Sequence, residues 1–265
     1  MIKRLLADHD LRPRKRFGQN FLADPNIVDR IVRFAGVDAG TKVVEIGAGT
    51  GTLTAALAAT GATVVSYEID RGLEPVLKEV LGAFANVDVR FADVQRVDLN
   101  EDLGDGHWVL VANLPYNVGT PILLDTLRNV PAIALFVVMV QREVAGRLVA
   151  EPGSKVYGLP SVVAGLWGRP VFGFEVPPSV FIPPPDVDSA VVRIDRISPS
   201  PFASRAAELA ASAFGQRRKM IRRSLGVAVA DVATLLDAAG IDGTRRAETL
   251  SVAEYVHLAE KEAGL

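Results

Sequence analysis

The tetrapeptide Asn113-Leu114-Pro115-Tyr116 combines an amide, a fixed turn and an aromatic ring. The N6 amine of adenine is a poor nucleophile because its lone pair is delocalised into the ring. Acceptors for its two hydrogens, here the Asn113 side-chain carbonyl and the Leu114 backbone carbonyl, would localise the lone pair for in-line attack on a methyl group. Pro115 fixes the turn, and stacking of an extruded base on Tyr116 is worth about 1–3 kcal/mol. The motif therefore suits adenine methylation by positioning and electrostatics. Taken alone, it fits a plain proline turn equally well.

A glycine turn and three acidic residues predict where the methyl donor binds. Gly47 and Gly49 follow an apolar run, and glycines there let the backbone bend tightly and approach a ligand. Glu68 closes the next apolar run, where a carboxylate can accept both hydroxyls of a ribose. These features fit a dinucleotide or an adenosyl cofactor. Glu45, placed to hold a cationic amino-acid end, and Asp93, placed to accept from an adenine amine, favour S-adenosylmethionine.

The elements that must position these residues alternate between strand and helix. Apolar runs predict strands over 43–46, 62–68, 87–91, 108–112 and 134–140, and helical composition predicts helices over 52–59, 73–81 and 121–127. This alternation is typical of an α/β fold: a Rossmann-like class I methyltransferase fold with a mostly parallel sheet and helices on both faces. Ligands bind such sheets at the carboxyl ends of the strands, where all of these polar residues fall.

The pattern changes after about residue 171. Strand-like pieces, among them 189–194, alternate with prolines, and two strands without an intervening helix predict an antiparallel hairpin at one edge of the sheet. Ser198-Pro199-Ser200-Pro201 is typical of a linker, and helical periodicity without strand signals follows it. We expect a methyltransferase domain with a basic N-terminal arm over 1–197 and a small all-helical, RNA-contacting domain over 198–265.

Composition excludes several classes of site. Among 265 residues there is no cysteine, so neither a disulfide nor a cysteine-based zinc site is possible. The three histidines are far apart and lack ligand spacing, so no metal site is expected. No apolar segment follows the basic N-terminal residues, and no apolar run is long enough to span a bilayer. We expect a cytoplasmic, monomeric protein with no membrane partner.

The net charge is −2, which does not by itself indicate a nucleic-acid-binding protein, but the positions of the basic residues are more informative. Basic residues cluster at 12–16, 217–223 and 245–246. Such clusters form an electrostatic footprint for RNA phosphates, although any one of them alone fits a solvated helix face as well. The residues expected to contact RNA are Arg14, Lys15, Arg217, Arg218, Lys219, Arg222 and Arg223.

Along nearly the whole chain, these motifs resemble the KsgA-type rRNA adenine N6,N6-dimethyltransferases. Residues 16–22, Arg-Phe-Gly-Gln-Asn-Phe-Leu, look like the N-terminal cofactor motif of that family. Residues 140–145 and 151–158 resemble its bacterial branch. Residues 181–189 look like its phenylalanine-proline motif, and residues 213–219 resemble its RNA-facing C-terminal segment.

The resemblance implies further roles. Asn20 and Leu22 would touch the methionine part of S-adenosylmethionine, and Phe181 would sandwich the base opposite Tyr116. The substrate would be two adjacent adenosines in the 3′-terminal hairpin of 16S rRNA within an immature small ribosomal subunit. The reaction would thus be coupled to subunit biogenesis. One departure is Ala48-Gly49-Thr50, where the family commonly has proline-glycine-leucine; the glycine is kept, so the same cofactor is expected.

Three alternatives remain open. An Erm-type methylase of large-subunit rRNA shares the cofactor and catalytic motifs, but residues 151–155 and 217–219 favour the KsgA branch. A DNA adenine methylase is disfavoured because no separate sequence-reading domain is evident. A non-catalytic ribosome assembly factor with this fold would be expected to have lost Asn113 or the glycine turn, and both are intact.

Overall fold

The computed structural model describes residues 2–265, with only the backbone of Lys15, and it divides into two compact units. The first contains the residues up to Ala145 together with Val171–Arg196, and the second contains Gly146–Pro170 and Ile197–Leu265. The sequence pattern places the second domain from residue 198. The structure begins its last segment at 197 and adds residues 146–170 to the same unit. Among the described residues, no helix is both long and apolar enough to cross a membrane.

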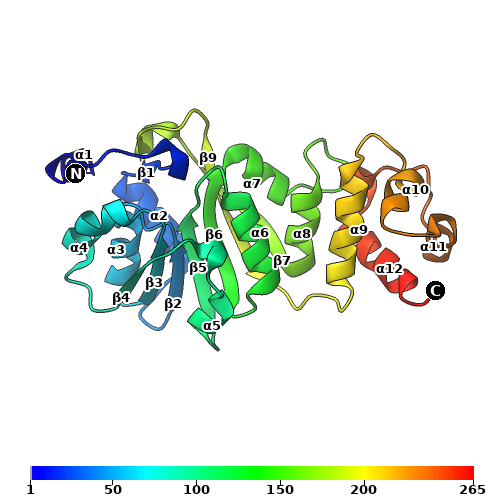
Figure 1. The fold of residues 1–265 in the computed structure, drawn as a ribbon, viewed down its shortest axis with the longest axis horizontal. Helices are drawn as coiled ribbons and strands as arrows, with labels where there is room; N and C mark the ends of the chain where they lie inside the picture. Colours follow the sequence, from blue (N-terminus) through cyan, green and yellow to red (C-terminus); the bar gives the residue numbers. More distant parts are fainter. Residues whose placement is uncertain (1) are drawn as a thin grey trace. The chain divides into compact units, whose positions relative to one another are not determined.

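A seven-stranded sheet forms the centre of the first unit (Figure 1). Its strands are β2 (Lys42–Ile46), β3 (Thr63–Glu68), β4 (Val87–Phe91), β5 (Trp108–Asn113), β6 (Ile133–Gln141), β7 (Gly168–Val176) and β9 (Ser189–Arg196), in the order β4-β3-β2-β5-β6-β9-β7. Strands β4, β3, β2, β5 and β6 run parallel, and β9 pairs antiparallel with β6. The strand order reverses direction between β2 and β5, and such switch points form ligand crevices.

The α/β fold with a mostly parallel sheet is confirmed. Every predicted strand of the parallel part begins and ends within one residue of its observed bounds, because buried parallel strands are marked by continuous apolar runs. Strands β7 and β9 are neighbours at one edge of the sheet, where two edge strands were expected.

Helices of the first unit precede these strands or lie between them in the chain. They are α1 (Ile2–Asp8), α2 (Pro25–Ala35), α3 (Thr52–Ala59), α4 (Glu74–Leu81), α5 (Leu99–Leu103), α6 (Gly119–Asn129) and the start of α7 (Arg142–Leu148). Helix α2 begins where the Asp24 carboxylate accepts from the backbone N–H of Asn26, and it ends at Gly36 in the left-handed conformation. Its buried Val28 and Ile31 lie in one core cluster with Val137 of β6.

A second, two-stranded sheet joins distant segments of the first unit. Strand β1 (Phe21–Leu22) pairs antiparallel with β8 (Phe181–Ile182), so that Leu22 lies opposite Phe181. Leu22 and Phe181 belong to the cluster that contains Val28, while Phe21 packs with α1 and α4 in a neighbouring cluster. This pairing fixes the N-terminal arm beside the carboxyl edge of the main sheet.

The second unit is helical. It contains α8 (Leu159–Trp167), α9 (Ala203–Gly215), α10 (Ile221–Ser224), α11 (Val232–Ala239) and α12 (Val252–Glu262), and its interior includes Leu209, Phe214 and Tyr255. Arg205 of α9 makes a two-fold ion pair with Glu262 of α12, with both N···O distances at 2.7 Å. The contacts of α8 with α9 explain why residues 146–170 group with this unit.

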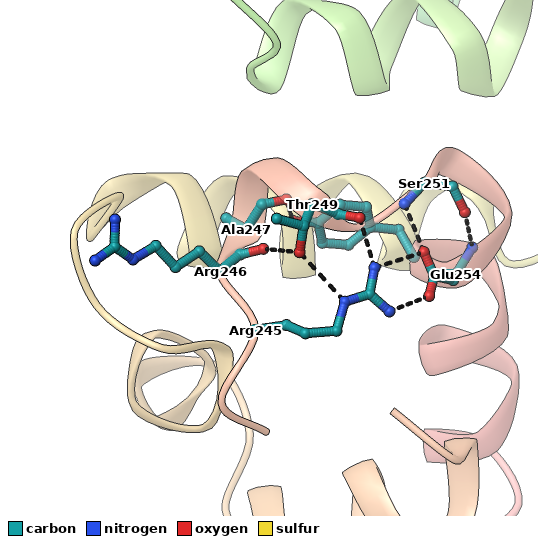
Figure 2. Close-up of polar contacts among 7 residues, drawn as sticks. Arg245, Arg246, Ala247, Thr249, Ser251 and Glu254 are labelled. Atoms are coloured by element: carbon teal, nitrogen blue, oxygen red, sulfur yellow. Dashed lines mark hydrogen bonds and ion pairs between the residues drawn. The ribbon is translucent and has the colours of Figure 1, made fainter. Parts of the chain in front are cut away.

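Figure 2 shows how the turn before α12 is held. The Arg245 guanidinium donates to both carboxylate oxygens of Glu254 and to the backbone carbonyl of Thr249. Glu254 also accepts from the backbone N–H of Ser251, at 2.7 Å, while the Ser251 hydroxyl caps the Glu254 N–H. This reciprocal capping box starts α12. Arg245 lowers the pKa of Glu254 to about 2.

We expect Glu254→Gln to lower the thermal midpoint of unfolding by roughly 2–4 °C at pH 7, for a loss of about 1 kcal/mol at this partly exposed pair. Because the folded-state pKa lies below the ordinary 4.5, the stabilisation is present above pH 4.5 and is lost as the pH falls toward 2. Scanning calorimetry between pH 7 and 3 should show the thermal midpoints of the unmodified protein and of Glu254→Gln converging as the pH falls. Glu260→Gln, at a more exposed carboxylate of the same helix, is the control. A difference in thermal midpoint that stays constant with pH would contradict stabilisation by the ionised Glu254.

Candidate active site

A cleft of about 950 Å³ that opens to solvent lies at the carboxyl ends of β2, β3, β4 and β5. Its walls come from the N-terminal arm at residues 16–21, the glycine turn after β2, the end of β3, residues 92–95 and the loop 113–118. A smaller cavity of about 300 Å³ adjoins it and is lined by Leu22, Glu45 and Thr50 among others. The segments that bear the predicted chemistry, far apart in sequence, therefore meet at the switch point of the sheet.

The glycine turn follows β2 closely. Gly47 and Gly49 have φ angles of +90° and +56°, which side-chain-bearing residues rarely adopt. A Cβ on Gly49 would also stand 3.1 Å from the Phe21 ring of the arm. The turn can thus approach both the arm and a ligand only with glycine at this position.

Glu68, at the end of β3, is held by two backbone donors. One carboxylate oxygen accepts from the Gly49 N–H and the other from the Asp70 N–H, both at 2.8 Å. Burial raises the pKa of Glu68, and these two hydrogen bonds oppose the rise. Since a carboxylate has about four acceptor positions, each oxygen keeps one for a ligand hydroxyl.

Glu45 is fully buried beneath the glycine turn. One of its oxygens accepts from the hydroxyls of Thr54, at 2.6 Å, and Ser66, at 2.7 Å. Burial raises its pKa to about 7, although both hydroxyls lower it. A cation delivered to the adjoining cavity would favour the ionised form.

Asn113 ends β5 and faces the arm. Its side-chain N–H donates to the backbone carbonyl of Asn20 at 3.1 Å. Because this bond engages the nitrogen end of the amide, the carbonyl oxygen is left for another donor. The Asn20 side chain in turn donates to the Gly18 carbonyl at 3.4 Å, and Asn20 and Asn113 both line the cleft.

The rest of the tetrapeptide forms the turn into α6. The Leu114 side chain is buried, and the Leu114 backbone N–H donates to the Met139 carbonyl. The Pro115 carbonyl accepts from the Gly119 N–H at 2.7 Å. The half-buried Tyr116 lines the cleft, and its hydroxyl is hydrogen-bonded to that of Ser189 at the start of β9. Burial raises the pKa of Tyr116. The Ser189 bond holds the hydroxyl end of the ring against β9.

Asp93 lines the cleft and begins a short helical turn, where its carboxylate accepts from the Gln95 N–H and lies 3.5 Å from Arg96.

Phe181 lies elsewhere than its predicted stacking position. It is only 2% exposed and belongs to the apolar core with Leu22, while the residues that line the cleft do not include it. The pairing of β8 with β1 turns its side chain inward, so the described conformation does not offer its face to a base opposite Tyr116. Leu22 is likewise a core residue, and it reaches the smaller cavity only.

Several residues of the cleft carry no sequence signal of their own. Ile69, beside Glu68, is 48% exposed although it is a large apolar residue, and it lines the cleft together with Phe17 and Ile122. The exposure of Ile69, which only the structure shows, indicates an apolar ligand face beside the strand-end carboxylate.

The basic residues predicted to contact RNA fall into two groups. Arg14 of the first unit is ion-paired with the buried Asp70 at 2.7 Å; the side chain of Lys15 lies outside the described residues. In the second unit, exposed side chains belong to Arg217, Arg218, Lys219, Arg222 and Arg223.

The second group does not form two turns of one helix. Helix α9 ends at Gly215, and a loop precedes α10. That loop and the start of α10, residues 216–223, are here called the basic loop. It is tied to the turn of Figure 2, because the Ile221 N–H donates to the Arg245 carbonyl at 2.6 Å and Met220 pairs with Arg246. Arg217 also donates to the Tyr157 carbonyl.

Comparison with known proteins decides the family. The family model described as ribosomal RNA adenine dimethylase matches residues 11–263. The chain belongs to this family. A dimethylase relative from Magnetococcus marinus, named ribosomal RNA small subunit methyltransferase A, is 43% identical over 97% of this chain and 95% of its own. One of the same name from Mycobacterium bovis (strain BCG / Pasteur 1173P2) is 44% identical over 99% of this chain and 87% of its own.

Solved structures agree with the fold of this dimethylase. The 23S rRNA methyltransferase ErmE superposes with a TM-score of 0.71 at 27% identity, covering 91% of this chain and 99% of its own. A dimethyladenosine transferase from Plasmodium falciparum superposes with a TM-score of 0.77 at 23% identity, covering 91% and 98% respectively. The first unit therefore has the fold of class I methyltransferases.

The buried Glu45 predicts a stability effect in the ligand-free dimethylase. Its folded-state pKa, about 7, lies above the ordinary 4.5, so ionisation destabilises the fold increasingly as the pH rises from 4.5 through 7. Glu45→Gln should raise the thermal midpoint by roughly 3–6 °C at pH 8 and by little at pH 5. Glu101→Gln, at an exposed carboxylate, should leave it unchanged. A lower midpoint of Glu45→Gln at pH 8 would show that the carboxylate stabilises the fold.

Proposed function

We propose that this protein transfers methyl groups from S-adenosylmethionine to N6 of two adjacent adenosines in the 3′-terminal hairpin of 16S rRNA. It acts on an immature small ribosomal subunit, in the cytoplasm. The observation that carries the proposal is the Asn113 amide, whose nitrogen is engaged by Asn20 so that its oxygen is free to accept from an amine in the cleft.

The residues of the cleft fit S-adenosylmethionine. The free acceptor positions of Glu68 suit the two ribose hydroxyls, and Asp93 suits the adenine amine. Ile69 offers an exposed apolar face to the adenine ring. Gly47 and Gly49 leave room along the backbone, where a Cβ on Gly49 would crowd Phe21. Asn20 and the buried Glu45 lie where the amino-acid end would be held.

When bound, S-adenosylmethionine supplies an electrophilic methyl group on a sulfonium sulfur. In the first transfer Asn113, through its side-chain oxygen, and Leu114, through its backbone carbonyl, accept from the two hydrogens of the target N6 and localise its lone pair; in the second transfer one of them accepts from the single hydrogen that remains. The new C–N bond forms as the C–S bond breaks, and the surplus N6 proton passes to solvent. Tyr116, held by Ser189, provides the stacking face for the extruded base.

Small-subunit rRNA is favoured over large-subunit rRNA by the relatives. Those named for the small subunit share 43–44% identity with nearly the whole chain, whereas ErmE shares 27%. Exposed cations of the basic loop suit the phosphates of a structured RNA.

Replacing the amide tests the chemistry. Asn113→Ala should lower kcat on undermethylated small subunits by about 100- to 1,000-fold, as expected when a preorganised polar group is lost. Equilibrium dialysis should find the affinity for S-adenosylmethionine within tenfold of the unmodified protein. Asn129→Ala, at an asparagine outside the cleft, is the control. Unchanged kcat in Asn113→Ala would exclude the proposed mechanism.

The substrate is tested with radiolabelled S-adenosylmethionine and three acceptors: undermethylated small subunits, protein-free large-subunit rRNA and duplex DNA. Nucleoside analysis should find dimethyladenosine in the small-subunit RNA alone. Label in the large-subunit RNA or in the DNA would refute the assignment. So would cofactor binding without transfer to any acceptor, which would indicate a non-catalytic assembly factor.

The basic loop is tested by charge reversal. The double variant Arg218→Glu, Lys219→Glu should weaken binding to the small subunit. The slope of log K against log salt concentration should become shallower by about one for each phosphate that the loop no longer neutralises. Affinity for S-adenosylmethionine should be unchanged. Lys78→Glu, at an exposed lysine of the first unit, controls for a charge reversal outside the loop. Unaltered RNA affinity in the double variant would remove the loop from the interface.

A further inference from the structure

Asp70 is a buried carboxylate two residues beyond the end of β3, only 4% exposed. One oxygen accepts from the Arg14 guanidinium at 2.7 Å, and the other accepts from the Gln19 side-chain amide at 2.9 Å. The Gln19 amide oxygen in turn accepts from the Arg14 backbone N–H at 2.7 Å. Asp70, Arg14 and Gln19 thus form a closed set of contacts, here called the clasp, between the N-terminal arm and the main sheet.

On the sheet side, the clasp is continuous with the group proposed to hold the ribose. The Asp70 N–H donates to Glu68, whose other oxygen accepts from Gly49. The Asp70 carboxylate also accepts from the Gly72 N–H at 3.0 Å, which fixes the backbone after β3. Any shift of Asp70 would therefore move the Glu68 carboxylate.

On the arm side, the clasp leads directly to the proposed catalytic amide. Asn20, adjacent to Gln19, supplies the carbonyl that orients Asn113. A Cβ on Gly18 would stand 3.0 Å from the Asn117 side chain, so the arm passes tightly against the loop that follows Asn113. Residues 16–21 form one wall of the cleft.

We propose that Asp70 is a positioning residue that, through Arg14 and Gln19, holds the arm against the cleft. It thereby positions the Glu68 carboxylate, proposed to bind the ribose, and the Asn113 amide relative to each other for methyl transfer. The role rests on the proposed function and gives Arg14 a part in holding the cofactor side of the enzyme. The buried carboxylate needs a cationic partner, and Arg14 supplies it at 2.7 Å.

The clasp is tested with Arg14→Met, which removes the cation and keeps most of the side-chain length, and with Asp70→Asn. Arg4→Met is the matched control, because it removes an arginine–aspartate pair on the exposed face of α1, where Arg4 is 88% exposed. Three properties are measured, the first two without RNA and the third at saturating RNA. They are the affinity for S-adenosylmethionine by calorimetry, amide hydrogen exchange of residues 14–22, and the single-turnover methylation rate at saturating cofactor.

Both clasp variants should bind S-adenosylmethionine about ten- to a hundredfold more weakly, exchange the arm amides at least tenfold faster, and transfer methyl more slowly even at saturating cofactor. The double variant should be no worse than the more severe single variant, since both break the same unit. Arg14→Lys should recover part of the affinity. Unchanged melting of both units would show that a general loss of folding does not explain the defect.

The proposal is overturned if Arg14→Met binds the cofactor normally and only its RNA affinity falls. It is also overturned if the losses of cofactor affinity in Arg14→Met and Asp70→Asn add in the double variant. Cofactor affinity and hydrogen exchange are measured without RNA, so they test the clasp even if the enzyme proves to have another RNA substrate.

Discussion

The two backbone hydrogen bonds to Glu68 are the contacts on which the rest of the site depends. One comes from the glycine turn after β2 and the other from the residue that begins the connection after β3. Together they join neighbouring strand ends into one rigid edge, with the ligand-binding face of the carboxylate still open. Arg14 and Gln19 then hold the arm to that edge through Asp70, and Asn20 of the arm orients Asn113, while Ser189 of β9 holds the Tyr116 hydroxyl.

Sequence reasoning reached the sheet and its polar edge because both are local properties. A buried parallel strand is a short apolar run, and polar residues at or just after its carboxyl end lie near the crevice, so Glu68, Asp93 and Asn113 could be placed in advance. The helices also agreed where their ends carried turn residues, as in α3.

Long-range pairing could not be predicted in this way. Phe181 lies in a two-residue strand that pairs with β1, where it faces Leu22 and turns inward. The local sequence pattern gives no indication of that partner. Arg14 belongs to a basic cluster in sequence, yet its partner Asp70 is 56 positions away. The basic loop resembles a helix in composition, but its backbone is drawn into pairing with residues 243–246. The grouping of residues 146–170 with the helical unit follows from tertiary packing of α8.

Glu45 has a consequence for the thermodynamics of the cofactor. In the ligand-free protein burial raises the pKa of its carboxyl group to about 7, so this group binds a proton at a higher pH than an exposed glutamate does. A cationic amino group brought beside it would stabilise the carboxylate, so binding of the proposed methyl donor would release protons from this group. The heat of binding would then depend on the ionisation enthalpy of the buffer. Replacement of the donor by its demethylated product, which has the same amino group, would exchange no proton at this position. The enzyme would therefore exchange spent for fresh donor without a change in the charge of its core.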